Sequence, residues 1–308
     1  MALTIVYVHG NGNKVREDLL KQQWDEALFG RDMGVSSRMA YWAPLRYPQP
    51  LPDPASDETT EELPQASLQE EPSSAAQTSE EFITEVAIEV QSEFASVAPL
   101  ELGTLAGAEP LEAWLRDMTY TADALAEGED AEPPLSALVL PLPRPLRIAA
   151  FRALVQRTFV DVYAYLFGGL GQPMRDVVHR AVSGIDGPVI VLGHSLGSII
   201  AYDALRARRS AALDVPLLVT VGSPLGVTEV QDLVEQPLHV PAAAAAWRNV
   251  SDARDLVALD HTLRPEYAPP DRCTDFLVRN DSANHHGIRE YLSSAPVQQP
   301  ILDLFQTG

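Results

Sequence analysis

The chain has 308 residues and a formal net charge of −21 at pH 7, with the apolar and charged content of a soluble globular protein. The acidic excess is local, because residues 51–135 contain about 21 Asp and Glu side chains against the single Arg116, which leaves about −1 for the rest. Such a segment repels phosphate groups and anionic membrane surfaces, so a nucleic-acid partner is not expected.

The chain has one cysteine, Cys273, and therefore no internal disulfide. Its apolar neighbours predict a small buried strand residue rather than a catalytic thiol. No run of 18 apolar residues occurs, and no basic leader precedes the first apolar run at residues 3–8. We therefore expect no transmembrane segment and a cytoplasmic location.

The first elements alternate between strand and helix. Residues 3–8 form a fully apolar run that predicts a buried strand, and residues 15–29 place leucine and tryptophan side chains at helical spacing. Residues 37–42 predict a second strand, which ends at a series of prolines beginning with Pro44.

From Pro44 to Pro143 the chain is predicted to be an insertion, residues 44–143, into a core domain of residues 1–43 and 144–308. Residues 51–78 are acidic, rich in Pro, Ser and Thr and poor in large apolar residues, so we expect a mobile loop there. Two helices are expected next, because apolar residues recur at spacings of three and four. We expect these helices to pack on the main domain, to form a lid over an apolar pocket, or to do both. Their apolar residues are Phe82, Val86, Val90 and Phe94 in the first and Leu111, Trp114, Leu115 and Met118 in the second.

The remaining chain again alternates between helical and strand patterns. Residues 147–166 predict one long amphipathic helix, and residues 173–182 predict another. This alternation predicts an α/β protein with a mostly parallel central sheet and helices on both faces. The expected strands are residues 189–192, 215–221, 246–250 and 273–278.

The sequence Gly193-His194-Ser195-Leu196-Gly197 joins the apolar strand 189–192 to a predicted helix. Glycines on both sides of a serine allow a sharp strand-to-helix turn that exposes the serine oxygen above a sheet, a nucleophile elbow. A serine that only caps the helix would leave both glycines unexplained. Ser195 is therefore the candidate nucleophile.

Several motifs in this order resemble the α/β-hydrolase superfamily of serine esterases and lipases, over the whole chain except the insertion. Taken singly the motifs are only moderately specific, but their order and spacing together are distinctive. They are Tyr7-Val8-His9-Gly10-Asn11-Gly12, the Ser195 pentapeptide, Gly222-Ser223-Pro224-Leu225, Trp247-Arg248-Asn249-Val250 with Asp255-Leu256-Val257, and His286 with Tyr291.

The resemblance implies a catalytic triad in the chain order serine, acid, histidine. Asp255 is the preferred acid because it follows a strand by a few residues and precedes two apolar residues, and Asp252 is the competitor. Either carboxylate could instead cap the following turn. His286 is preferred over His285 as the base, because its loop leads into the last helix.

The glycine-rich segment after the first strand resembles the family's oxyanion loop. Backbone N–H groups that stabilise the negative charge of the transition state are assigned to Asn11 and Leu196. A phosphate-binding loop would need a Gly-Lys-Ser/Thr sequence, which is missing here. Ser223, in the segment that resembles a pocket-lining strand end, is predicted to be structural.

These residues imply a serine hydrolase that cleaves carboxylic esters through an acyl-enzyme, with no cofactor and no metal. The expected partner is a small-molecule ester or lipid substrate. An acyltransferase or thioesterase with the same triad is an alternative, as is a non-catalytic binding module on a hydrolase scaffold. A histidine base also predicts a rate that falls in mildly acidic solution.

Overall fold

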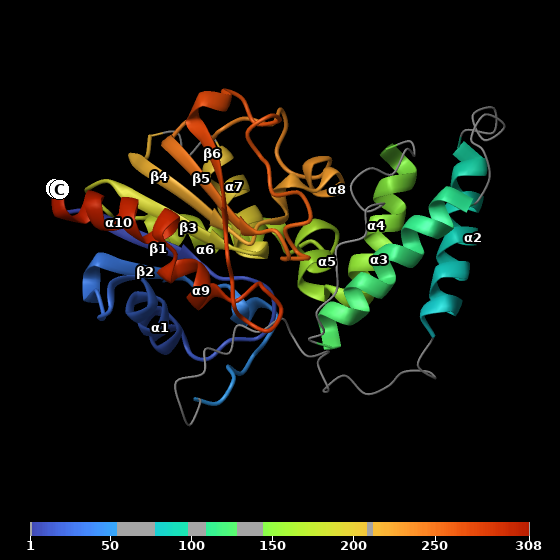
Figure 1. The fold of residues 1–308 in the computed structure, drawn as a ribbon, viewed down its shortest axis with the longest axis horizontal. Helices are drawn as coiled ribbons and strands as arrows, with labels where there is room; N and C mark the ends of the chain where they lie inside the picture. Colours follow the sequence, from blue (N-terminus) through green and yellow to red (C-terminus); the bar gives the residue numbers. More distant parts are fainter. Residues whose placement is uncertain (1, 54–77, 98–108, 128–143, 208–211, 308) are drawn as a thin grey trace.

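The computed structural model describes residues 2–53, 78–97, 109–127, 144–207 and 212–307. Six strands in this part of the chain form one sheet in the order β2-β1-β3-β4-β5-β6, and every neighbouring pair is parallel (Figure 1). The predicted α/β class with a parallel central sheet is thus confirmed. The strands are β1 (Thr4–Val8), β2 (Ser37–Ala40), β3 (Val189–His194), β4 (Val215–Val221), β5 (Ala244–Asp252) and β6 (Cys273–Val278).

Helices cover both faces of this sheet, which explains why β1 and β3 are buried along their whole length. Alternate residues of β1 join different cores: Val6 and Val8 contact the layer that contains α6 and α7, and Ile5 and Tyr7 contact the layer of α1, α9 and α10. The bounds are α1 (Glu17–Phe29), α6 (Gly171–Val182), α7 (Leu196–Arg206), α9 (Ile288–Ser293) and α10 (Ala295–Thr307), with the short α8 (Thr228–Gln231) after β4.

The two helices expected in the insertion are present as α2 (Ser79–Val97) and α3 (Glu109–Glu127). They lie beside α4 (Arg144–Thr158), at the end of the molecule farthest from α10 (Figure 1). Their buried apolar side chains belong to the same core cluster as those of α4, so burial of one face of each helix holds this group together. The predicted loop at residues 51–78 falls largely outside the described residues.

The single helix predicted over residues 147–166 is wrong, because the structure has two helices there, α4 and α5 (Val160–Leu166). They are separated at Phe159, where φ is −120° and ψ is 65°. The break falls within Thr158-Phe159-Val160, three consecutive β-branched or aromatic residues of low helix propensity.

Cys273 lies at the start of β6 with 1% of its surface exposed, as the sequence predicts. Burial is the main cause that raises the pKa of its thiol to about 12, and the nearby Asp275 adds to the effect. Among the described residues, none of the helices combines the length and the apolar composition that a bilayer span needs.

Candidate active site

Ser195 lies at the junction where β3 ends at His194 and α7 begins at Leu196. Its φ of 52° and ψ of −128° place a non-glycine residue in a sparsely populated region of backbone space, a kind of strain that is concentrated at functional sites. The turn is supported by Ser198, whose hydroxyl donates to the Ser195 carbonyl oxygen at 2.5 Å and shares a hydrogen bond of 2.7 Å with Ser223. Ser223 thus has the structural contacts that the sequence predicts.

Close backbone contacts explain the glycine on each side of this turn. A methyl group on Gly193 would lie 2.7 Å from both the Gly197 carbonyl oxygen and the Ser198 Cα. A methyl group on Gly197 would overlap the carbonyl oxygen of Val8 and lie 2.5 Å from that of His9. The start of α7 is therefore packed directly against the end of β1, which brings Ser195 to the loop that follows β1.

We expect Gly197→Ala to lower the free energy of unfolding by about 3 kcal/mol or more, because the added methyl group can fit only if α7 moves away from β1. Urea unfolding at neutral pH measures this loss. Gly30→Ala is the matched control: Gly30 has a φ of 70° but no atom within 4 Å of the added carbon, so only the backbone cost of about 1–2 kcal/mol is expected. Equal losses in the two variants would contradict the close packing.

The loop after β1 lies against Ser195, since a methyl group on Gly10 would be 2.9 Å from the Ser195 Cβ. Among the described residues, the N–H of Asn11 has no hydrogen-bond partner, whereas the N–H of Gly12 donates to Asp161 at 2.7 Å. Asn11 therefore keeps a backbone donor available beside Ser195. Leu196 supplies a second, because the first N–H groups of a helix have no partner within the helix.

His9, at the beginning of this loop, contacts the segment that follows β2. Its Nε2 accepts hydrogen bonds from the backbone N–H groups of Trp42 and Ala43, at 3.1 and 3.3 Å. The His9 ring also stacks on the Trp42 ring with a centroid distance of 4.5 Å. These contacts anchor the beginning of the loop to the segment that follows β2.

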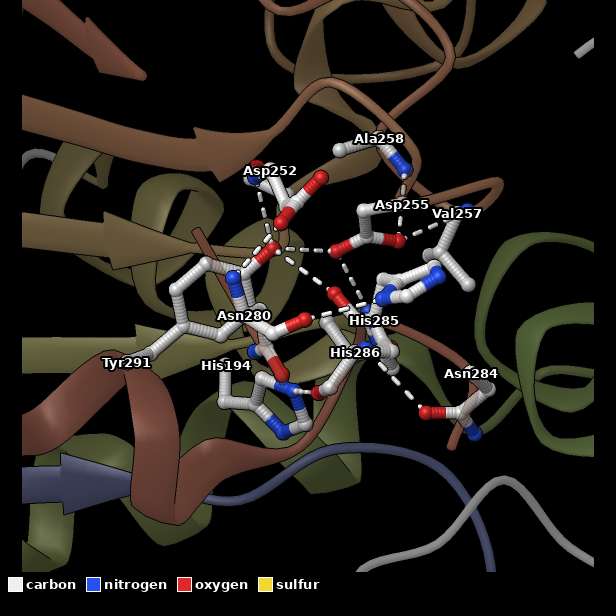
Figure 2. A network of polar contacts seen from close by, with 12 residues as sticks. His194, Asp252, Asp255, Val257, Ala258, Asn280, Asn284, His285, His286 and Tyr291 are labelled. Carbon is white, nitrogen blue, oxygen red and sulfur yellow. Dashed lines mark hydrogen bonds and ion pairs between the residues drawn. The ribbon is translucent and has the colours of Figure 1, made fainter. Parts of the chain in front are cut away.

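The structure brings together His286, which follows β6, and Asp255, which follows β5 (Figure 2). His286 Nδ1 lies 2.8 Å from Asp255 Oδ2 in a pair that is almost fully buried. An ionised carboxylate only accepts, so Nδ1 carries the hydrogen and Nε2 of the neutral ring is left as an acceptor. Nε2 is buried and has no hydrogen-bond partner in the described structure, so it is available to accept a proton.

Asp255 is held ionised by its hydrogen bonds. Burial raises the pKa of the carboxyl, but the nearby His286 and the hydrogen bonds from His286, Tyr291 and Val257 outweigh burial and place the pKa below its ordinary value. The Tyr291 hydroxyl donates to Oδ2 at 2.6 Å, and the N–H groups of Val257 and Ala258 donate to Oδ1 at 2.9 and 3.3 Å. A buried carboxylate beside an imidazole orients the ring and stabilises its protonated form.

The competing residues have other partners. Asp252 is the last residue of β5, and its carboxylate accepts hydrogen bonds from the backbone N–H groups of Arg254 at 2.7 Å and Asn280 at 2.5 Å. The Nδ1 of His285 donates to the Asn280 carbonyl oxygen at 2.8 Å. Between the two carboxylates and the two imidazoles that the sequence left open, the structure pairs Asp255 with His286.

The end of β4 lies between this pair and Ser195. The backbone N–H of Ser195 donates to the Val221 carbonyl oxygen at 3.1 Å, and the next residue, Gly222, would place a methyl group 2.8 Å from His286 Nδ1 and 2.9 Å from Asp255 Oδ2. Ser195 and His286 form no hydrogen bond among the described residues. Such bonds are commonly long before a substrate is bound.

Ser195, Asn11 and Leu196 line one cavity of about 80 Å³. Among the described residues, Thr121 from α3 contributes the only other polar side chain on its wall, and none of the described lining residues is charged. The remaining walls come from α3, α4, α5 and the segments that follow β4 and β5. These apolar residues are Met118, Phe151, Leu154, Val155, Phe159, Val162, Pro224, Val227, Val230, Leu256, Val257 and Leu259.

Three contributors to the site had no predicted role. Tyr291 was part of the family resemblance, but nothing in its sequence context indicates that its hydroxyl reaches Asp255. Asp161 contacts a loop 149 positions away, which no local pattern reports. For Phe151 and its neighbours, the helical periodicity predicted an apolar face but not which side of it would meet Ser195.

No family model matches this chain, and no curated protein or solved structure is significantly similar to it. The class of protein is therefore given by the structure alone: an α/β protein with an all-parallel six-stranded sheet flanked by helices. Within the described ranges, no three His, Cys, Asp or Glu residues are grouped as a metal site requires.

Proposed function

We propose that this chain is a serine hydrolase of the α/β-hydrolase type that cleaves carboxylic esters. The observation that carries the proposal is a serine on a strained strand-to-helix turn at the wall of an apolar cavity, together with a buried His–Asp pair that contacts the same end of β4 to which Ser195 is bonded. A serine hydroxyl is a weak nucleophile unless a base takes its proton and a third group orients that base. Ser195, His286 and Asp255 supply these three groups in this chain.

In this mechanism Ser195 Oγ attacks the ester carbonyl carbon while His286 Nε2 takes the hydroxyl proton. Asp255 keeps that proton acceptor in the correct tautomer and stabilises the imidazolium. The developing oxyanion is stabilised by the N–H groups of Asn11 and Leu196. His286 then gives its proton to the leaving alcohol, and water, activated by the same imidazole, releases the acid and regenerates Ser195.

The composition of the cavity wall favours a substrate with an apolar group on one side of the scissile bond. Thirteen of the sixteen described residues that line the cavity are apolar and none of the sixteen is charged, so an ionised substituent would lose its hydration there without compensation. Two of the polar lining residues, Ser195 and Asn11, are the proposed nucleophile and one of the proposed oxyanion donors. We therefore propose an uncharged ester with a hydrocarbon acyl or alcohol part as the substrate.

The test is intact-mass spectrometry after reaction with a fluorophosphonate, which phosphonylates an activated serine with loss of fluoride. We expect one adduct on the wild type, mapped to Ser195 by peptide analysis, because His286 makes that hydroxyl nucleophilic. Ser223→Ala is the matched control and should keep the adduct, since Ser223 is buried and bonded to Ser198. A folded wild type with no adduct would contradict the proposal and favour a binding module on a hydrolase scaffold.

A further inference from the structure

The peptide group between Asn11 and Gly12 is hydrogen-bonded at its oxygen and at its nitrogen by two buried side chains, one a donor and the other an acceptor. Lys14 Nζ donates to the Asn11 carbonyl oxygen at 2.5 Å, and Asp161 Oδ2 accepts from the Gly12 N–H at 2.7 Å. Lys14 is 2% exposed and the Asp161 side chain is 0% exposed. One peptide plane in the loop beside Ser195 is thus bonded at its oxygen and at its nitrogen.

These two bonds allow only one orientation of the peptide. An ammonium group is a donor only, and a carboxylate is an acceptor only. If the peptide rotated by half a turn, its oxygen would face Asp161 and its N–H would face Lys14, so both bonds would be lost in a buried place where unpaired polar groups are costly.

Lys14 and Asp161 together form a clamp on this peptide group, and the clamp determines which backbone N–H in the loop is available. The N–H of Gly12 is occupied by Asp161, while the N–H of Asn11, on the preceding peptide, has no partner among the described residues. Asn11 lines the cavity together with Ser195. We propose that Lys14 and Asp161 are positioning residues that fix Asn11 as an oxyanion donor, an inference that rests on the proposed function.

Asp161 is itself firmly placed. It lies in the first turn of α5, and its carboxylate also accepts hydrogen bonds from Arg46 Nε at 3.0 Å and from the Tyr47 hydroxyl at 2.9 Å. Its neighbours Phe159 and Val162 line the cavity. The helix that forms part of the cavity wall therefore also sets the position of the loop.

The test compares Lys14→Met and Asp161→Asn with the wild type on p-nitrophenyl butyrate. Each variant is expected to lower kcat by about 10²-fold with KM changed less than about 3-fold, because an oxyanion donor acts in the transition state rather than in the bound substrate. The inhibition constant of an alkylboronic acid, which forms a tetrahedral adduct with the serine, should rise by a similar factor. A merely structural role would not weaken boronate binding in step with kcat.

Tyr47→Phe is the matched control, because Asp161 keeps its hydrogen bonds from Arg46 and from the Gly12 N–H, and its kcat should stay within about 3-fold of the wild type. If Asp161→Asn fails to fold, Lys14→Met tests the same peptide from its other end. Folded variants with wild-type kcat and boronate affinity would overturn the clamp while leaving the proposed function intact. An inactive wild type that forms no fluorophosphonate adduct would instead overturn the proposed function, and the clamp with it.

Discussion

Replacement of Ser195 by alanine is expected to lower kcat for a short p-nitrophenyl ester by about 10⁵-fold or more, which leaves only the residual rate that binding and the oxyanion donors support without a nucleophile. The variant loses the oxygen that forms the acyl-enzyme, and no other serine in the described structure is on a comparable strand-to-helix turn. The measurement is release of p-nitrophenol under saturating substrate, with active-site concentration taken from the fluorophosphonate adduct of the wild type.

Folding is the control for this prediction. Ala at position 195 has the same backbone demands as Ser, and the Ser195 hydroxyl makes no hydrogen bond among the described residues. The urea unfolding curve of Ser195→Ala should therefore overlay that of the wild type within about 1 kcal/mol. Turnover retained by a folded Ser195→Ala variant would show that the nucleophile is a different residue.

The turn at Ser195 could be predicted because its determinants are contiguous. A β-branched run makes the strand, and the two glycines are required where α7 meets the backbone of β1. The same locality explains why most strands and helices were predicted within a few residues. The break at Phe159 was missed because helical periodicity continues on both sides of it, and only the low propensity of three residues indicates it.

The partners of Ser195 depend on contacts that the sequence does not specify. Asp252 and Asp255 both follow the apolar part of β5, so their order along the chain could not separate them. Which of the two carboxylates pairs with His286 depends on where β5 ends. It also depends on which backbone N–H groups donate hydrogen bonds to Asp252. Asp161 is a stronger case, since its contact with Gly12 links α5 to the first loop of the chain and leaves no local signal.

Asp255→Asn is expected to lower kcat by about 10⁴-fold, the size of effect produced when the carboxylate that orients a catalytic histidine becomes an amide. The Asn oxygen can still accept from the N–H groups of Val257 and Ala258 in place of Oδ1. An N–H in place of Oδ2 would face His286 Nδ1 and favour the other tautomer of His286. The hydrogen would then be on Nε2, where the proton of Ser195 has to be received. Steady-state hydrolysis of the same ester measures the loss.

Asp252→Asn is the matched control, because it alters a carboxylate three positions away that, within the described part of the chain, bonds only backbone N–H groups and Arg254. An Asn oxygen can accept one of these bonds, so we expect a loss of stability with kcat within about 10-fold of the wild type. A larger fall in kcat for Asp252→Asn than for Asp255→Asn would identify Asp252 as the acid.

The difference in stability between the wild type and Asp255→Asn should decrease as the pH falls. Burial raises the pKa of Asp255, but His286 and the hydrogen bonds to the carboxylate bring it below its ordinary value, so the folded chain holds this proton more weakly than the unfolded chain does. Such a group stabilises the fold above its unfolded pKa and loses this contribution as the pH falls through the folded pKa. The advantage of the wild type over Asp255→Asn in urea unfolding should therefore be constant near pH 7 and shrink below about pH 4. An advantage that grew on acidification would mean that Asp255 is protonated in the folded protein and does not act as the anionic partner of His286.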